Sequence, residues 1–227
     1  MSKKLIMSCM ALALTAFVPF VLPATASATN NPDLTESGAR VAVGQVFDGT
    51  LVGTADFMAT DGTTVQVSCN QALLTGSVTA NSGGTLTGSI TTADFWGSGG
   101  GVSPHNNKEE CKGSFGASYY TVPKTPLTIS STPTMLTDEI QLTDSSKSTV
   151  TFIIGSTTAG ACEYKTAGPI KGDFTTGATT VLTVRNTAAG SGASKVSGGF
   201  LCPSSWQLKM SFFLETNAAG NTELGIS

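Results

Sequence analysis

The sequence contains few of the side chains on which metalloenzymes, hydrolases and nucleic-acid-binding proteins depend. Its 227 residues include one histidine, two tryptophans and three tyrosines, and only 12% of them are charged. Nucleic-acid binding needs a basic face, which a net charge of −3 with scattered lysines and arginines does not provide. The single histidine, His105, and the lack of any CxxC pair also exclude the common zinc sites. We therefore expect no metal, no cofactor and no nucleic-acid partner.

Long hydrophobic runs are equally scarce, with one exception at the start of the chain. Two lysines precede the apolar run Leu5–Leu22, and small residues follow at Ala26 and Ala28. That order is typical of a secretory signal peptide, so residues 1–28 are predicted to be cleaved off. No later stretch is long and apolar enough to span a bilayer. Residues 29–227 carry a net charge of −5, because ten basic residues stand against fifteen acidic ones. We expect a secreted, extracellular protein, either free or held at the cell surface.

Four cysteines remain after the predicted cleavage, and their spacing does not suit a metal. An even number of cysteines in an exported chain indicates disulfides. Three pairings of the four are conceivable. We favour Cys69–Cys111 together with Cys162–Cys202, because these are neighbours in the sequence and each pair closes a loop of about 40 residues.

Helix-forming residues do not cluster anywhere in the mature chain, whereas strand signals recur along it. The best case is the C-terminal segment 200–216, in which an apolar residue stands at every second position from Trp206 to Leu214. Such alternation is typical of a half-buried strand. About ten short strands separated by Gly, Ser and Asn turns indicate a sandwich or a barrel. We expect an all-β fold, an antiparallel β-sandwich of jelly-roll or immunoglobulin-like type, in one domain over 40–227 after a flexible lead-in at 29–39.

A glycine-rich stretch, "GSGGG" at 97–101, faintly resembles the surroundings of a hydrolase serine. Catalysis by Ser98 would need a base, and only His105, seven residues further on in the same polar segment, could serve. The Gly-x-Ser-x-Gly pattern of a nucleophile elbow is missing. We therefore predict a strand that runs into a flexible turn, no catalytic residues and no enzymatic activity.

The acidic residues are mostly isolated, which argues against a glycosidase and against a calcium site. Asp48 and Asp61 each precede a glycine, and one carboxylate beside a glycine more often marks a turn than a site with six to eight oxygen ligands. Glu109 and Glu110 are adjacent between two lysines and are predicted to lie in a solvated turn. The pattern indicates neither a cation site nor a working pair of carboxylates.

Three aromatic residues are the candidates for ligand contact: Trp96, Tyr119 and Tyr120. Adjacent residues of a strand point to opposite faces, so one of the two tyrosines is expected to be exposed. An exposed aromatic could contact a ligand or another surface. The alternative is that both tyrosines lie on a half-buried edge.

Five segments resemble a group of small secreted bacterial proteins: "VSCN" at 67–70, "LTGSVT" at 74–79, "GTLTGSITTADFWG" at 84–97, "ACEYKTAGPIKGDF" at 161–174 and "GGFLCPSSWQLKMSF" at 198–212. The group includes exported alkane-oxidation activator proteins of pseudomonads and uncharacterised exported proteins of actinobacteria. The resemblance covers roughly 64–216. It implies an extracellular or cell-surface protein without catalytic residues, which acts at the matrix or with hydrophobic growth substrates, and it transfers no functional site.

These observations favour a secreted, non-enzymatic structural or interaction protein. Its expected partners are cell-surface or matrix components, or further copies of itself paired through sheet edges. The alternative is a small binding module for carbohydrate or an apolar ligand, which would need a concave aromatic or apolar patch. A secreted hydrolase that uses Ser98 or a hidden pair of carboxylates is the third hypothesis.

Overall fold

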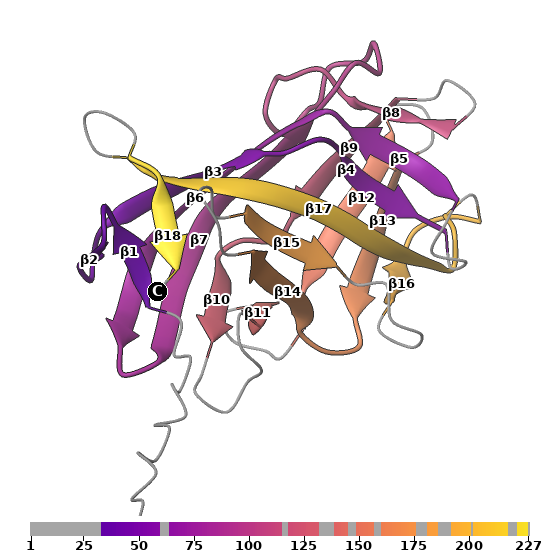
Figure 1. The fold of residues 1–227 in the computed structure, drawn as a ribbon. Coiled ribbons are helices and arrows are strands. Elements are labelled where there is room, and N and C mark those ends of the chain that lie inside the picture. Colours follow the sequence, from indigo (N-terminus) through magenta and orange to yellow (C-terminus); the bar gives the residue numbers. More distant parts are fainter. Residues whose placement is uncertain are drawn as a thin grey trace, which may run out of the picture.

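The computed structural model describes residues 33–59, 64–114, 118–131, 139–144, 149–156, 160–175, 181–185, 192–200, 202–217 and 222–226. Their regular structure consists of strands (Figure 1). The strands are β1 (Leu34–Glu36), β2 (Ala39–Arg40), β3 (Val46–Leu51), β4 (Ala55–Met58), β5 (Val65–Cys69), β6 (Gln71–Ser82), β7 (Thr85–Trp96), β8 (Cys111–Gly113), β9 (Ser118–Pro123), β10 (Leu127–Ser131), β11 (Glu139–Asp144), β12 (Thr151–Ser156), β13 (Gly160–Thr166), β14 (Ile170–Thr175), β15 (Val181–Arg185), β16 (Ala193–Ser197), β17 (Ser205–Thr216) and β18 (Leu224–Ile226). Within these residues, no helix could cross a membrane.

The large sheet closes on itself, because strand β17 is hydrogen-bonded along both of its edges. Starting from β17, the pairings run through β3, β6, β7, β10, β11, β14 and β15 and return to β17. The closed ring therefore has eight strands, all antiparallel to their neighbours. The predicted β-sandwich is wrong, and the fold is an eight-stranded antiparallel β-barrel. A sandwich has two sheets with free edges, whereas this sheet joins its first strands to its last long one.

A second ring of pairings also begins and ends at β17, so the barrel wall has two levels, each formed by one ring of strands. It runs from β17 through β16, β13, β12, β9, β8, β5 and β4 back to β17. Along one edge of β17, β3 pairs with residues 212–216 and β4 with residues 207–209. Along the other edge, β15 pairs with residues 209–213 and β16 with 205–206. The long strand β17, which crosses the whole view in Figure 1, therefore spans both levels.

Glycines inside the strands of the barrel wall make room for an aromatic ring, next to an irregularity in the pairing of β6 with β7 between Thr75 and Gly76. A Cβ atom at Gly76 would lie 2.6 Å from the Phe47 ring and 2.6 Å from the carbonyl oxygen of Ser89. Gly88, on the neighbouring strand, meets the same ring at 3.4 Å. Glycine inside a strand often marks a close approach or a barrel corner. Phe47 thus fills the space that the two missing side chains leave.

The interior of the barrel is an apolar core built by alternation along the strands. On β17, the side chains of Trp206, Leu208, Met210, Phe212 and Leu214 are all buried, which confirms the alternation that the sequence predicts. Together with the inward-facing residues of the other strands, they form one continuous cluster. Burial of this apolar surface is the main favourable term in folding.

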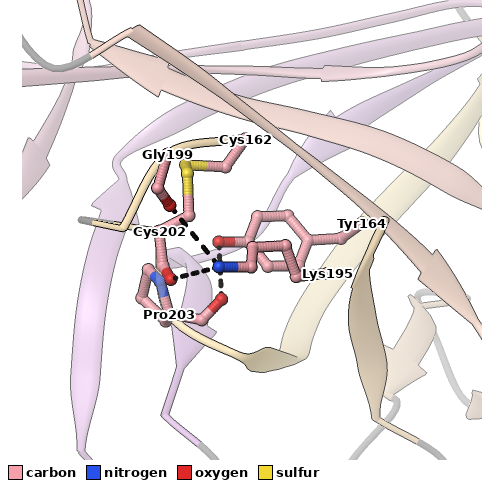
Figure 2. The surroundings of a disulfide bond; sticks show 6 residues. All are labelled: Cys162, Tyr164, Lys195, Gly199, Cys202 and Pro203. Carbon is pink, nitrogen blue, oxygen red and sulfur yellow. Dashed lines mark hydrogen bonds between the residues drawn. A yellow bond between two sulfur atoms is a disulfide. The ribbon is translucent and has the colours of Figure 1, made fainter. Parts of the chain in front are cut away.

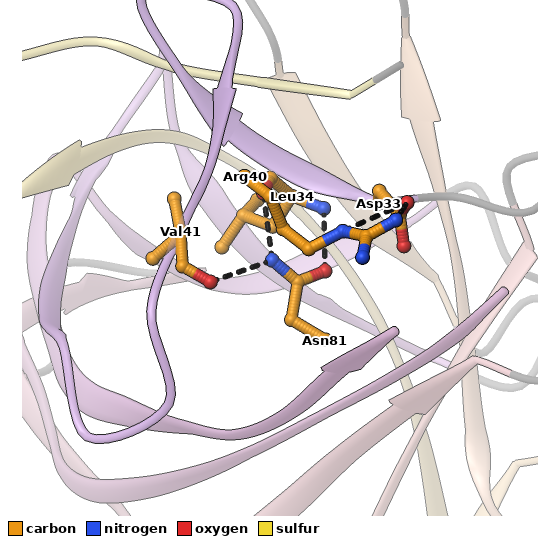
Figure 3. Close-up of polar contacts among 5 residues, drawn as sticks. All are labelled: Asp33, Leu34, Arg40, Val41 and Asn81. Atoms are coloured by element: carbon orange, nitrogen blue, oxygen red, sulfur yellow. Dashed lines mark hydrogen bonds and ion pairs between the residues drawn. The ribbon is translucent and has the colours of Figure 1, made fainter. Parts of the chain in front are cut away.

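One end of the barrel is covered by a separate small sheet in the order β18–β1–β2. Leu34 and Leu224 of this sheet are buried in the common core. The Asn81 side chain, at the end of β6, accepts a hydrogen bond from Leu34 N (2.9 Å) and donates to the carbonyl oxygens of Leu34 (2.7 Å) and Val41 (2.9 Å), as Figure 3 shows. The described part of the predicted lead-in therefore contains β1 and the first residue of β2. The predicted signal peptide lies outside the described residues.

Candidate functional site

Both disulfides are formed with the favoured pairing. Cys69 at the end of β5 is bonded to Cys111 at the start of β8, and both side chains are fully buried. Cys162 on β13 is bonded to Cys202, which lies in the connection between β16 and β17. Two disulfides are compatible with an oxidising compartment outside the cytosol.

The glycine-rich stretch is packed against the chain that leads into Cys111, and this differs from the flexible turn that the sequence suggests. Gly97 N donates to Glu109 O (3.0 Å), Gly99 N donates to Glu110 O (2.8 Å), and Glu110 N donates to Gly101 O (2.8 Å). A Cβ atom at Gly99 would lie 2.5 Å from the carbonyl oxygen of Cys111. The glycines therefore allow two backbones to approach closely, which is a different use from free rotation.

The two residues of the conceivable hydrolase pair, Ser98 within this stretch and His105 beyond its end, form no mutual hydrogen bond. Ser98 is exposed, and the structure gives it no base among the described residues. The His105 ring packs on Tyr120, with ring centroids 4.9 Å apart, and the backbone N of His105 donates to Ser103 Oγ (3.2 Å). The described residues also contain no cluster of three metal-ligating side chains.

The three candidate aromatics are held by protein contacts. Lys108 Nζ lies 3.6 Å from the centroid of the Trp96 ring, a cation–π contact, and Trp96 Nε1 donates to Gln71 Oε1 (2.5 Å). One face of this ring is therefore covered by the lysine. Tyr120 is buried and Tyr119 is half-buried, so neither tyrosine is fully exposed. This arrangement matches the alternative of a half-buried edge.

Glu110 is a buried residue whose carboxyl group lies next to Gly101. The sequence instead predicts that Glu110 lies in a solvated turn. Its side chain is 1% exposed, and neither carboxylate oxygen has a hydrogen-bond partner among the described residues. Burial raises the pKa of Glu110 above the ordinary value of 4.5. Burial also raises the pKa of Tyr120, and the negative charge of Glu110 adds to this effect. No sequence signal separates Glu110 from its exposed neighbour Glu109.

We expect the substitution Glu110→Gln to remove a pH-dependent loss of stability. The folded state holds the Glu110 proton more tightly than the unfolded chain, so the protein loses stability as the pH rises from 4.5 through the raised pKa. The stability of the glutamine variant should therefore rise relative to that of the wild type as the pH increases above 4.5. Urea unfolding across this pH range measures the effect.

Glu109→Gln is the matched control for this prediction. Glu109 is exposed and its Oε1 accepts a hydrogen bond from Gly100 N (3.0 Å), so its removal should change stability little at any pH. A Glu110→Gln variant with the same pH profile as the wild type would show that Glu110 is not the titrating group.

The other disulfide braces a turn between β16 and β17 that carries the most exposed aromatic side chain of the described residues. We call residues 198–200 and 202–203 the Phe200 turn. Phe200 is 93% exposed, and Val196, at the end of β16, is 58% exposed. Figure 2 shows the contacts that hold the turn: Lys195 Nζ donates to the carbonyl oxygens of Gly199 (3.4 Å) and Cys202 (3.3 Å).

A hydrogen bond from Tyr164 and the close approach of Gly198 to the disulfide also hold the Phe200 turn against the barrel. The Tyr164 hydroxyl donates to the carbonyl oxygen of Pro203 (3.1 Å), and Tyr164 itself is fully buried. Gly198 has a φ of 122°, and a Cβ atom there would lie 2.5 Å from Cys202 Sγ. The sequence places the Phe200 region at the start of the last strand, whereas β17 begins at Ser205. The pair of glycines before Phe200 was the available sign of a turn.

Comparison with protein-family models, curated proteins and solved structures finds no match for this chain. The resemblance to secreted bacterial proteins therefore stays a prediction.

Proposed function

We propose that this chain is an exported, non-enzymatic protein that acts by binding a cell-surface or matrix component through the Phe200 turn. The observation that carries the proposal is the 93% exposure of Phe200 on a turn that a disulfide and three side-chain hydrogen bonds support. Aromatic side chains dominate the binding energy of many interfaces. A turn that is already ordered loses little conformational freedom on binding, so more of the contact energy remains as affinity.

Because the barrel is closed, contact through the Phe200 turn is favoured over assembly through free strand edges. A free edge offers unpaired N–H and C=O groups to another chain, and a closed barrel has no such edge. Self-association by edge pairing, which the sequence suggested, would therefore be restricted to the small sheet β18–β1–β2. The exposed apolar surface of Phe200 needs no such edge.

Fractionation of producing cells into medium, cell surface and matrix tests the proposal. We expect the wild type in the surface or matrix fraction, as residues 29–227 with a mass four hydrogens below that of the reduced chain. Phe200→Ser should lower the bound fraction about tenfold, since loss of a central aromatic contact costs more than 1 kcal/mol. Wild-type protein found entirely in the medium would contradict the proposal.

Val43→Ser is the matched control, because Val43 is 66% exposed on a different connection of the barrel. It should leave the bound fraction unchanged. Equal melting temperatures of both variants and the wild type would exclude unfolding as the cause. If Phe200→Ser binds like the wild type, the contact lies elsewhere on the surface.

A further inference from the structure

The centre of the barrel contains a cavity of about 50 Å³ that lies between the two levels of the wall. Its lining comes from strands all around the barrel, and no polar atom faces the space. Four phenylalanine rings dominate the wall: Phe57, Phe95, Phe152 and Phe212. The site is separate from the Phe200 turn and is not needed for the proposed function.

The four rings contact one another through tilted and edge-to-face arrangements. Phe57 contacts Phe95 with centroids 6.1 Å apart and Phe152 at the same distance, and Phe95 contacts Phe212 at 6.4 Å. The ring planes are inclined to one another by 49° to 79°, so these rings do not stack face to face. Ala93 has the smallest side chain of the lining.

We propose that this cavity is a binding site for a small apolar molecule. An apolar cavity is dry, because water would find no hydrogen-bond partner there, and its walls lack dispersion contacts that a guest would supply. A cavity of about 150 Å³ can hold benzene or xenon, so the space in this barrel fits a guest of roughly one to three heavy atoms. Met210 lies in the wall, and its flexible, polarizable side chain can adjust to the guest.

Xenon is the probe of choice, since it is apolar and offers no polar contact. NMR titration of the wild-type protein should show saturable shifts of the Leu74, Ile90 and Val184 methyl groups, which line the cavity. The Leu224 methyl groups, in the small sheet, should not shift. Absence of saturable shifts in the cavity methyl groups would overturn the proposal.

Two substitutions and one control test whether the probe binds in this cavity or at another apolar site. Ala93→Val should fill the space and weaken xenon binding at least tenfold, whereas Ala72→Val, on the neighbouring strand and buried but outside the lining, should leave binding unchanged. Phe152→Leu enlarges the cavity and should strengthen binding of a larger probe, such as benzene, at least tenfold relative to the wild type. Equal xenon binding by Ala93→Val and the wild type, or no gain of benzene binding by Phe152→Leu, would contradict the site.

Discussion

Asn81→Leu is expected to lower the free energy of unfolding by about 2–4 kcal/mol, one of the two largest effects that we predict. The leucine side chain fits a similar space but can neither donate nor accept a hydrogen bond. Leu34 N and the carbonyl oxygen of Val41 would then be buried without the partners that Asn81 supplies. Leu34 O would keep a hydrogen bond from Val41 N (2.9 Å), so two orphaned groups set the size of the effect.

The loss should be concentrated in the small sheet that covers the end of the barrel. Amide hydrogen exchange should accelerate at Leu34 and along β1, because this sheet can open before the barrel unfolds. Asn217→Leu is the matched control: Asn217 is exposed, and its Nδ2 donates to Asp48 Oδ2 (2.7 Å), so its removal should cost less than about 1 kcal/mol. Equal effects of the two substitutions would show that the Asn81 hydrogen bonds do not hold the sheet.

Asn81 also shows where sequence reasoning stops. In the sequence it stands beside "SGG", a context in which asparagine favours a turn. Its partners Leu34 and Val41 lie 47 and 40 residues earlier in the chain. Only the folded arrangement brings the three together, and no local pattern marks that meeting.

The same limit explains the error in the fold class. Period-two alternation from Trp206 to Leu214 correctly predicts a strand with one buried face. Sandwiches and barrels share this alternation, so the pattern cannot distinguish them. Closure depends on the pairing of Phe47–Leu51 with Phe212–Thr216, strands from opposite ends of the chain. Glycines inside strands, such as Gly76, were the available local sign of a curved wall.

The same limit applies to the candidate sites, since some of their features could be predicted from the sequence and others could not. The pairing of the four cysteines was predicted from their order in the sequence and is confirmed, although Cys69–Cys111 joins β5 to β8, which are neighbours in the sheet but not consecutive in the chain. Burial of Glu110 and exposure of Phe200 could not be predicted, since each depends on how a connection folds back onto the barrel. The contact of Lys108 with the Trp96 ring could not be predicted either, because Lys108 lies twelve positions after Trp96 in the sequence.

The other large effect concerns the disulfides, each removed as a pair of alanines. In the chain-entropy model, loops of 42 and 40 residues stabilise the fold by about 4 kcal/mol each and differ by only about 0.04 kcal/mol. Loss of Cys69–Cys111 should nevertheless cost more, because both sulfurs are fully buried and Gly99 packs on the Cys111 backbone. Loss of Cys162–Cys202 should release the Phe200 turn. Urea unfolding of both double variants, with m-values compared, measures the two costs.

The stability costs of removing the two disulfides can be compared directly, because each disulfide reduces the entropy of the unfolded chain by nearly the same amount. A larger cost at Cys69–Cys111 therefore measures native packing around the glycine-rich stretch. A larger cost at Cys162–Cys202 would contradict that account and would make the Phe200 turn part of the cooperative core. Hydrogen exchange in the Cys162→Ala/Cys202→Ala variant decides between these outcomes. The backbone amide of residue 202 donates to Gly199 O (3.1 Å), and we expect this amide to exchange faster in the variant. Exchange along β17 should be unchanged.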